Sequence, residues 1–485
     1  MLGWDNLPHS DRPLLDPNFV WHATTPSSLE TKLRNMSEQD RTPPVSSRRT
    51  FIRNTSLGLA TASALADVPL VHAAGEEGEI KIGLIGCGGR GTGALLDAVG
   101  AAAKVIYPQS GYHTEDVAEG AKVEKKRIKV VALADMFGDR LERCRAQMAK
   151  LDIDISPDFC FTGFDAYKKL LAVSDVNYVI LATPPHFRPM HLQAAIEAGK
   201  HVFMEKPAAV DAPGVRMVMA AGELAKEKGL GIAAGTQRRH DRSYRETINR
   251  IHEGAIGDIV YAKCYWNGSQ IWVINRQDGW SDIEWQMRNW NYFTWLSGDH
   301  YVEQHVHNLD VMNWTLGSHP IRAVSGQGGR QVRVGDVHGH IFDHFAVEFE
   351  YPNGVSMFSQ ARQIHGCKNT VGEEVVGTNG RSNCSNYVEP SDGEKWRYRE
   401  REASAYRLEH EDLITSIREG KPINEAQAIA EATLTGIMGR EACYSGQPVD
   451  WETALKSEMR LGPKTYELGD FPIPPVAMPG KYRFS

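Results

Sequence analysis

A glycine-rich turn between a buried strand and a helix constrains the fold of this chain more than any other feature. An isoleucine-rich run, "IKIGLI", ends at residue 85, and G-x-G-x-x-G follows it before helical spacing begins. Glycines here let the backbone turn tightly and approach a pyrophosphate, whose charge is favoured at the helix N-terminus. We therefore predict nucleotide-binding residues at Gly86, Gly88, Gly89, Arg90 and Gly91.

The same pattern of strand and helix repeats along the next 150 residues. Short apolar runs that predict buried strands lie at 128–135, 176–183, 200–205 and 230–235, with helical spacing between them. Such alternation predicts βαβ units and a parallel sheet with helices on both faces. The fold class is therefore α/β, with a doubly wound Rossmann domain over residues 80–237 and an insertion at 101–127.

The pattern changes after Arg238. Residues 257–268 and 343–364 alternate apolar and polar side chains, and the second run contains a Pro-Asn-Gly turn. Helical segments lie around them, so we predict an α+β domain with a mostly antiparallel sheet over 238–460. The proline-rich segment 461–485 is predicted to be an arm that lies across a surface or a neighbouring subunit.

Residues 1–79 are predicted to be a leader and linker. Ser47–Arg53 reads "SRRTFIR" and precedes a mildly apolar run with small residues at its end, which is typical of a twin-arginine export signal. An ordinary basic linker is the alternative, and translation starts at either Met1 or Met36. We expect a periplasmic or otherwise exported protein with no spanning helix, because no stretch reaches 18 apolar residues.

Charge and cysteine usage exclude several classes of function. The formal net charge is −7, and no basic stripe of the kind that binds nucleic acid is present. The seven cysteines are scattered and form no C-x-x-C pair, which argues against structural zinc and against a disulfide framework. The predicted partner is therefore a small molecule.

The choice of dinucleotide depends on the end of the second strand. Asp135 closes that strand, where a carboxylate binds a ribose hydroxyl and repels a 2′-phosphate. We predict NAD as the cofactor. Arg140 lies nearby and leaves NADP possible.

Two further motifs carry ionisable groups. Lys206-Pro207 follows the fourth strand, at the edge of the sheet where ligands bind, and a lysine there can exchange a proton with a substrate hydroxyl. Farther along, His300, Glu303 and His307 are spaced to share one face of a helix, and Asp310 continues it. Such a face could also hold a divalent metal, but we predict none.

Four stretches together resemble the Gfo/Idh/MocA family, which includes glucose–fructose oxidoreductase and inositol dehydrogenase. They are "GLIGCGGRG", "ATPPHFRPMHLQAAIEAGKHVFMEKP", "GTQRR" and "EQHVHNLDVMNWTLG", and the resemblance runs from about residue 80 to about 450. It implies a Rossmann domain and a C-terminal domain whose large open sheet makes a homodimer or homotetramer. It also implies NAD(P)-dependent oxidation of a sugar or cyclitol hydroxyl.

The resemblance also implies roles for single residues. Lys206 and His307 match the catalytic lysine and histidine, and Glu303 stands where the family usually has an aspartate, so that it either reaches the same hydroxyl or orients His307. The remaining matches are cofactor residues Thr183, Pro184, His186 and Glu205, and substrate residues Arg238 and Asp310.

The predicted function is oxidation of a sugar, sugar derivative or cyclitol hydroxyl with a tightly bound, recycled cofactor. Export in the folded state would leave the protein without a free pool of NAD. Two alternatives remain: an NAD-dependent glycosidase that works by transient oxidation and elimination, and a non-catalytic sugar-binding member of the fold. We expect most tryptophans between Trp272 and Trp314 to lie in a core or interface, with one or two free to stack on a sugar ring.

Overall fold

Six parallel strands form the N-terminal sheet in the computed structural model, which describes residues 78–107, 112–125, 127–400 and 403–484. The leader and its predicted signal lie outside the described residues. The strands, in spatial order, are β5 (Cys160–Thr162), β4 (Ile128–Asp135), β1 (Ile80–Ile85), β6 (Tyr178–Leu181), β7 (His201–Met204) and β8 (Ile232–Ala234). This order confirms the predicted doubly wound parallel sheet.

Helices cover both faces of this sheet, which explains why its strands read as continuous apolar runs. Val179 and Leu181 of β6 belong to one core cluster, and Tyr178 and Ile180 belong to another. The helices on the first face are α3 (Ala166–Leu171), α4 (Arg188–Glu197) and α5 (Ala212–Glu227). Those on the second face are α1 (Gly89–Val99), α2 (Gly138–Ala149) and α11 (Ala405–Arg418).

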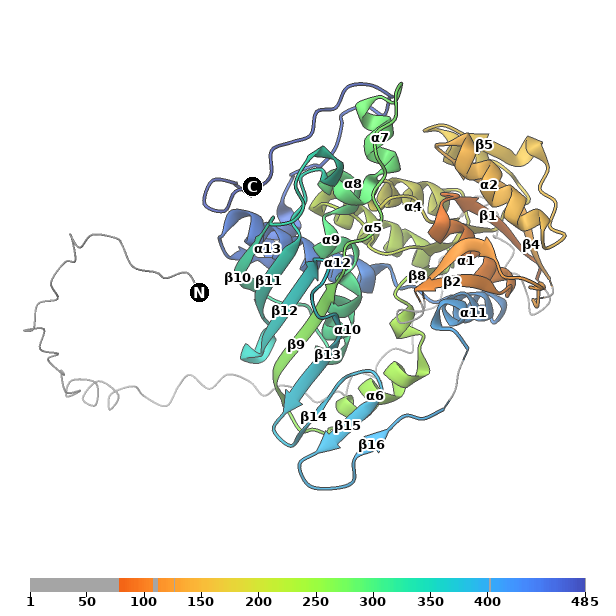
Figure 1. Ribbon diagram of the computed structural model, residues 1–485. Helices are drawn as coiled ribbons and strands as arrows, with labels where there is room; N and C mark the ends of the chain where they lie inside the picture. Colours follow the sequence, from red (N-terminus) through yellow and green to blue (C-terminus); the bar gives the residue numbers. More distant parts are fainter. Residues whose placement is uncertain (1–77, 108–111, 126, 401–402, 485) are drawn as a thin grey trace, which may run out of the picture. The chain divides into compact units, whose positions relative to one another are not determined.

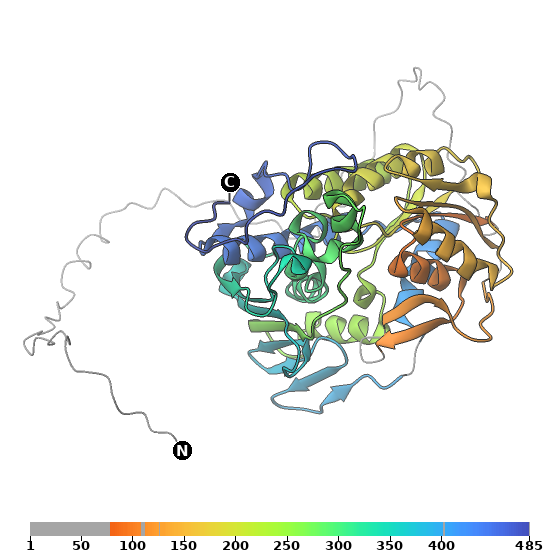
Figure 2. The ribbon, with the colours of Figure 1, turned by 45° about the horizontal axis from the view of Figure 1, so that its top comes forward.

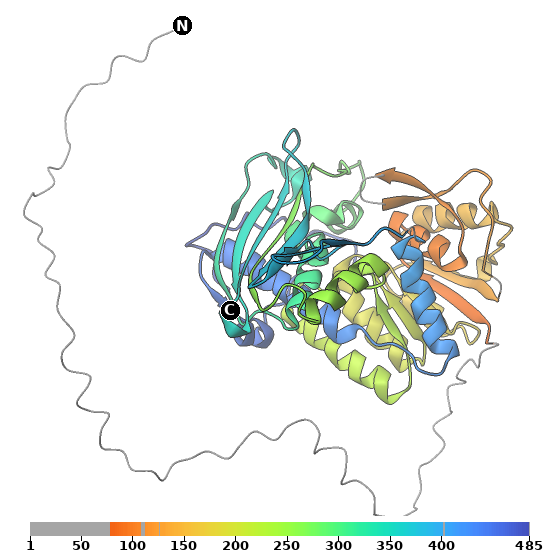
Figure 3. The same cartoon turned by 90° about the horizontal axis from the view of Figure 1, so that it is seen from below.

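Helix α11 joins the N-terminal core although it comes late in the chain. Leu413, Ile414 and Ile417 pack in the cluster with α1 and α2, and Figure 3 shows the blue α11 against the orange and yellow-green elements. The predicted insertion at 101–127 contains a hairpin of β2 (Ala103–Tyr107) and β3 (Tyr112–Val117). The core of the Rossmann half therefore extends beyond the residues that its strands define.

A nine-stranded sheet forms the second half (Figure 1). Its strands, in spatial order, are β16 (Trp396–Arg397), β15 (Tyr387–Pro390), β14 (Gly380–Ser382), β13 (Thr370–Gly377), β9 (Ile259–Gly268), β12 (Ser356–Gln363), β11 (His344–Glu350), β10 (Arg322–Gly329) and β17 (Val449–Asp450). Only the β9–β12 pairing is parallel among the described pairs of this sheet, so the prediction of a mostly antiparallel sheet is confirmed.

One face of the large sheet is packed by helices. On β12, Met357 and Ser359 are buried while Phe358 is 43% exposed, as expected for alternating side chains. The remaining helices of this half are α6 (Arg242–His252), α7 (Asp282–Arg288), α8 (Thr294–Ser297), α9 (His300–Glu303), α10 (Val306–Leu316), α12 (Ala426–Ser445) and α13 (Trp451–Lys456). Of these, α10 and α12 pack against the inner strands β9, β13, β10 and β11, whereas α6 and α13 contact the outer strands β15 and β17.

Helix α12 approaches the sheet very closely because glycines line the contact. A Cβ atom on Gly326 of β10 would lie 2.5 Å from the Cys443 nitrogen of α12, and one on Gly439 of α12 would lie 3.0 Å from the Phe349 ring of β11. Only glycine allows this separation between helix and strand.

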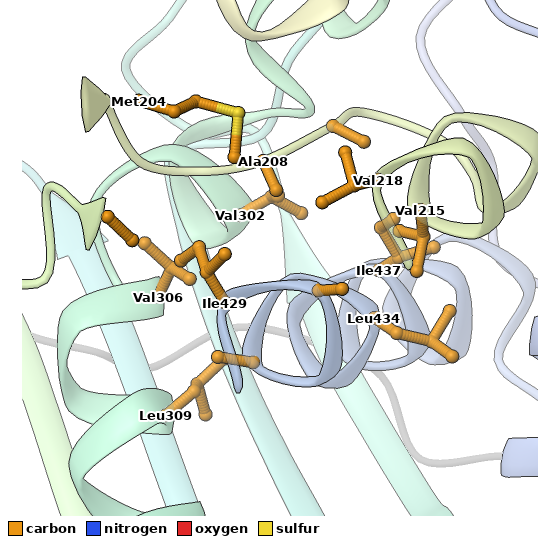
Figure 4. Close-up of a cluster of buried hydrophobic side chains, with 14 of the residues drawn as sticks. Met204, Ala208, Val215, Val218, Val302, Val306, Leu309, Ile429, Leu434 and Ile437 are labelled. Carbon is orange, nitrogen blue, oxygen red and sulfur yellow. The ribbon is translucent and has the colours of Figure 1, made fainter. Parts of the chain in front are cut away.

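The two halves share one apolar core, shown in Figure 4. Its side chains come from the end of β7, from α5, from α9 and α10, and from α12, and those drawn include Met204, Ala208, Val215, Val218, Val302, Val306, Leu309, Ile429, Leu434 and Ile437. Truncating one such buried side chain to alanine typically costs about 2–5 kcal/mol. This shared core fixes the Rossmann edge relative to α9 and α10.

The single helix predicted around His307 is divided in two. Helix α9 ends at Glu303 and α10 begins at Val306, so the heptad-like spacing of His300, Glu303 and His307 does not produce one continuous face. Asp299, which precedes α9, has a φ of 71° and accepts hydrogen bonds from the Tyr444 hydroxyl and from the Phe342 backbone. These bonds anchor the start of α9.

The C-terminal arm lies on the surface of its own chain. Figure 2 shows the dark blue segment that follows α13 crossing above the green helices. None of the helices that the structure describes is long and apolar enough to cross a membrane.

Candidate active site

The glycine-rich turn between β1 and α1 has the geometry that a dinucleotide requires. Gly86 has a φ of +101°, and a Cβ on Gly91 would lie 1.8 Å from the Gly86 carbonyl oxygen, so both positions require glycine. A Cβ on Gly88 would meet nothing within 4 Å, which leaves its backbone open to a ligand. Helix α1 begins at Gly89, and the first N–H groups of a helix have no partner within the helix, so the turn fits a pyrophosphate.

Asp135 lies at the end of β4, beside the turn. Its carboxylate accepts hydrogen bonds from the backbone nitrogens of Cys87 at 2.7 Å and Phe137 at 2.8 Å. Burial raises the pKa of Asp135, and the charge of Arg140 opposes this shift. The side chain thus connects the glycine-rich turn to the position where an adenosine ribose is held in this fold.

The predicted cofactor residues after β6 are only partly available for a ligand. The Thr183 hydroxyl lies 3.3 Å from Nδ1 of His191, and Pro184 precedes a short 3₁₀ turn. His186 contacts the C-terminal arm, with its Nε2 2.9 Å from the Tyr466 hydroxyl. Burial lowers the pKa of His186 to about 4, so the ring is neutral.

Lys206 and Glu303 meet across the two halves of the protein. The Lys206 Nζ donates to Oε1 of Glu303 at 2.7 Å and to the backbone oxygen of the same residue, also at 2.7 Å. Both side chains are largely buried, and the Lys206–Pro207 peptide is cis. No described hydrogen bond joins Glu303 to His307, so in this geometry Glu303 holds the lysine rather than the histidine.

His307 lies at the start of α10, in the first turn. Burial lowers its pKa well below the ordinary value, and the charge of Lys206 acts in the same direction. Its Nδ1 is buried without a hydrogen-bond partner, and its ring stacks on Trp266 with 5.6 Å between centroids. The ring is therefore a neutral imidazole with an unsatisfied polar atom, next to an aromatic surface.

Arg90 connects the glycine-rich turn to the lysine. It forms ion pairs with Glu205, Asp97 and Glu409, the last two at 3.2 Å. Oε2 of Glu205 in turn accepts from the Lys206 backbone nitrogen at 3.2 Å. Burial alone would raise the pKa of Glu205, but the charge of Arg90 lowers it. Arg90 and Glu205 therefore belong to a rigid ionic network under the predicted cofactor site.

Two adjacent arginines, Arg238 and Arg239, lie in a short 3₁₀ turn after β8, at the same edge of the sheet. Nη1 of Arg238 donates to Glu373 at 2.5 Å, and its guanidinium lies 5.7 Å from the Trp266 ring. Nε of Arg239 donates to both carboxylate oxygens of Asp310, at 2.9 and 2.8 Å. Asp310 is 1% exposed, so it holds Arg239 and does not face an open substrate site.

The structure brings most of the predicted residues to one edge. The ends of β1, β4, β6, β7 and β8 carry the predicted cofactor residues, Lys206 and Arg238, and α9 and α10 place Glu303 and His307 beside them. His300 is separate: its ring is fully buried and packs 5.1 Å from that of Phe345. No group of three metal-ligating side chains is found among the described residues.

Sequence reasoning missed three side chains of the site. Trp266 lies on β9 and Glu373 on the neighbouring β13. The sequence shows only that each belongs to a strand of alternating side chains, which does not indicate that the two strands pair. Arg188 is 4% exposed, and its Nη1 donates to the Pro207 carbonyl at 2.7 Å, next to the lysine. Arg188 follows the "TPPH" stretch by two residues and belongs to no motif that would have indicated its position in the site.

Family models match both halves of the chain. A model of the Gfo/Idh/MocA oxidoreductase family, NAD-binding Rossmann fold, matches residues 80–236, and a model of the GFO/IDH/MocA C-terminal domain matches residues 244–383. Together they cover more than half of the chain.

Individual relatives agree with this assignment. Inositol 2-dehydrogenase/D-chiro-inositol 3-dehydrogenase of Halalkalibacterium halodurans is 26% identical over 194 residues, which are 39% of this chain and 45% of that protein. Inositol 2-dehydrogenase 1 of Saccharopolyspora erythraea is 27% identical over 304 residues, 59% of this chain and 80% of that protein. The chain spans about half the length of four curated relatives that it matches.

A solved structure shows the same fold. The oxidoreductase domain protein of Kribbella flavida superposes with a TM-score of 0.58 at 20% identity, covering 77% of this chain and 99% of that one. The glycine-rich turn, the lysine at the end of β7 and the histidine of α10 lie within the two matched models. The chain therefore belongs to the Gfo/Idh/MocA family of oxidoreductases, with an NAD-binding Rossmann fold in its N-terminal half.

Proposed function

We propose that this protein oxidises a hydroxyl group of a neutral sugar, sugar derivative or cyclitol with NAD. The observation that carries the proposal is the meeting of Lys206 with Glu303 at 2.7 Å, beside the neutral ring of His307. This places a hydrogen-bond donor and a proton acceptor together at the carboxyl edge of the Rossmann sheet, where ligands bind in such folds.

Lys206, His307 and Glu303 have different roles in this reaction. The Lys206 ammonium donates a hydrogen bond to the substrate hydroxyl oxygen, and His307 accepts the hydroxyl proton. Because its pKa is lowered, the imidazole is unprotonated at neutral pH and able to accept. The chemistry that bound NAD supplies is acceptance of the hydride from the same carbon. Glu303 keeps the ammonium in place.

The charges around the site favour a neutral substrate. Arg90 pairs with three carboxylates, Lys206 pairs with Glu303, and Arg238 pairs with Glu373. An acidic substrate would have to displace one of these buried partners, which costs desolvation and leaves a carboxylate unpaired. The Trp266 face beside His307 suits the C–H surface of a sugar or cyclitol ring.

Charges at the end of β4 favour NAD over NADP. Arg288 lies there but pairs with Asp139 and Glu284, each at 3.0 Å. Asp135 adds a carboxylate where the 2′-phosphate of NADP would lie. Arg140, the second basic side chain here, donates to the Arg288 carbonyl and lies over the Phe137 ring. A phosphate would therefore meet the Asp135 carboxylate beside two arginines that already have partners.

The test replaces Lys206 with methionine, which keeps the length of the side chain and removes the charge. We expect the variant to retain bound NAD and to reduce it about a hundredfold more slowly when a panel of sugars and cyclitols is added. The rate is followed by the absorbance of the reduced nicotinamide. Equal rates in the variant and the natural protein would support a non-catalytic sugar-binding role instead. Release of phenol from aryl glycosides would support the glycosidase alternative.

We also propose that the protein is exported by the twin-arginine route and works with a cofactor that is reoxidised in place by a second carbonyl compound. The support is the Arg48-Arg49 pair and the apolar run after it. Replacing both arginines with lysine should leave the protein in the cytoplasmic fraction with its leader uncleaved. N-terminal sequencing of the mature protein gives the cleavage position.

We propose further that the protein is a homodimer or homotetramer. The support is the face of the large sheet away from α10 and α12, where the exposed Phe358 packs 6.0 Å from Tyr261. A monomer in analytical ultracentrifugation at micromolar concentration would contradict this.

A further inference from the structure

A third apolar cluster covers the carboxyl edge of the Rossmann sheet. We call residues 280–297 and 461–473 the cover: the first range contains α7, α8 and the short turn between them, and the second is the start of the C-terminal arm. The cluster joins them to Phe137 at the end of β4 and Phe187 after β6. Its buried members from the cover are Ile283, Trp285, Met287, Tyr292, Phe293, Trp295 and Leu296.

The cover contacts the Rossmann domain beside Asp135. The Arg288 guanidinium binds both carboxylate oxygens of Asp139, at 3.0 and 3.2 Å, and lies 3.9 Å from the centre of the Phe137 ring. Arg140 donates to the Arg288 carbonyl at 3.2 Å. These residues immediately follow the strand end where an adenosine ribose is bound in this fold, so the cover lies over the adenosine side of the site.

The C-terminal arm holds α7 in this position. The Gln286 side chain donates to the Phe471 carbonyl at 2.5 Å, and the Phe471 nitrogen donates to Asp282 at 3.0 Å. The Ile283 nitrogen donates to the Gly469 carbonyl at 3.2 Å. Figure 1 shows the dark blue arm running alongside α7.

The same arm is fastened to the Rossmann domain. The Leu461 nitrogen donates to Asp211 at 2.9 Å, and the Tyr466 hydroxyl lies 2.9 Å from Nε2 of His186. Gly462 fits against His186 so closely that a Cβ would lie 2.9 Å from its ring. The arm therefore bridges the end of β6 and α7, which otherwise belong to different halves of the chain.

We propose that the cover retains NAD through the catalytic cycle, and that the dinucleotide leaves only after the arm separates from α7. The proposal rests on the proposed function, because it assigns the adenosine half of the cofactor to this edge. It extends that function by naming the residues that make the cofactor resident: Arg288 and Phe137 at the adenosine side, and Phe471, Gln286 and Tyr466 as the fastening.

The experiment measures how fast bound NAD exchanges with labelled NAD. The purified protein, loaded with unlabelled NAD, is mixed with an excess of radiolabelled NAD, and the retained label is counted after rapid gel filtration. Phe471→Ala removes the ring that packs on Trp295 and weakens the fastening to α7. Tyr466→Phe removes only the hydrogen bond to His186 and is expected to fold normally. Met478→Ala, in the same arm at a residue that is 57% exposed, is the control.

We expect Phe471→Ala to exchange NAD about tenfold faster than the natural protein, which corresponds to about 1.4 kcal/mol. Tyr466→Phe should exchange a few times faster, and Met478→Ala should be unchanged. Limited proteolysis in the arm should slow when NAD is added to the natural protein. Exchange that is complete within the mixing time, or equal rates in all four proteins, would overturn the proposal.

The two proposals fail separately. If the protein exchanges its NAD slowly but oxidises none of the tested polyols, the proposed function is refuted and the proposal about the cover stands. If the protein oxidises polyols but exchanges its NAD rapidly, the proposal about the cover is refuted and the proposed function stands.

Discussion

The contact between Lys206 and Glu303 sets the chemistry at the scale of single residues. It joins the end of β7 to the end of α9, and the carboxylate is one methylene longer than the aspartate that is usual in the family. Both the side chain and the backbone oxygen of Glu303 bind the ammonium. We expect that the shorter carboxylate of an aspartate at this position of α9 would not reach the lysine.

Restoring the usual aspartate should therefore impair the enzyme. Glu303→Asp shortens the side chain and breaks the 2.7 Å contact with Lys206 while keeping the charge. We expect kcat for the reduction of bound NAD to fall about tenfold, with KM for the polyol little changed. Steady-state kinetics measure both, and Glu303→Gln, which keeps the length, is the matched control. A Glu303→Asp variant with full activity would show that the contact is dispensable.

Single residues also show what sequence can and cannot reveal. The glycine-rich turn, Asp135 and Lys206 were predictable because each has a local pattern of strand followed by motif. Glu373 and Trp266 were not, because Glu373 meets Arg238 across 135 residues and depends on the pairing of β9 with β13. The role of Glu303 depends on its contact with Lys206, which lies in the other half of the chain. The spacing of residues along α9 and α10 carries no information about that contact.

At the scale of elements, the contact of α12 with β10 depends on glycine. The Gly326 backbone lies against the Cys443 nitrogen with no room for a side chain. The strands and helices were predictable from their periodicity, and the predicted fold class is confirmed. The break between α9 and α10 falls at Gln304 and His305, and it was not predictable because neither residue is a glycine or a proline.

A methyl group at Gly326 should destabilise the protein. Gly326→Ala places a Cβ 2.5 Å from the Cys443 nitrogen and pushes α12 from the sheet, for an expected loss of about 1–3 kcal/mol. Gly329→Ala, in the same strand, meets only the edge of His344 at 3.5 Å and serves as the control. Urea unfolding of the two variants measures the difference. Equal midpoints would mean that α12 shifts at no cost.

A charged histidine joins the end of the Rossmann domain to α11. His240 lies 2.7 Å from Asp412 and 3.2 Å from Glu425. Burial alone would lower its pKa, but hydrogen bonds to both carboxylates raise it to about 9. Because the folded protein holds this proton more tightly than the unfolded chain, the stabilisation is fully present below pH 6.5 and is lost as the pH rises through about 9.

We therefore expect the urea midpoint of the natural protein to fall between pH 6.5 and about 9. His240→Gln keeps hydrogen-bonding capacity and removes the charge, so its midpoint should be lower at neutral pH and should change less across this window. The difference should be at most about 3 kcal/mol. Parallel pH dependence in both proteins would assign the effect to other groups.

At the scale of the whole molecule, several histidines are buried in the neutral form. Burial lowers the pKa of His186, His201 and His340 to about 4. It lowers the pKa of His191 and His305 to about 3. The unfolded chain binds these protons at higher pH than the folded protein, so stability is lost as the pH falls below 6.5. Buried carboxyl groups oppose this trend: burial raises the pKa of Asp299 to about 6, and it also raises the pKa values of Asp135, Asp310, Glu373 and Glu409.

The neutral buried histidines predict that the free energy of unfolding begins to fall at a higher pH than the range in which ordinary carboxylates titrate. We expect the urea midpoint to fall steadily from pH 6.5 to about 5, whereas unpaired carboxyl groups titrate near about 4. Double replacement of His201 and His340 by glutamine should flatten this slope without changing the midpoint trend at alkaline pH. An unchanged slope would show that these two rings take up their protons without unfolding.

Helix α11 has a consequence for the order in which the chain can mature. The first sheet begins at residue 80, but Leu413, Ile414 and Ile417 close one of its faces. During synthesis the nucleotide-binding half therefore emerges from the ribosome with this face only partly covered, by α1 and α2, until α11 (Ala405–Arg418) has been made. We expect a fragment that ends at the apparent domain boundary to expose that face and to aggregate, so the cofactor site is best studied in a protein that includes α11.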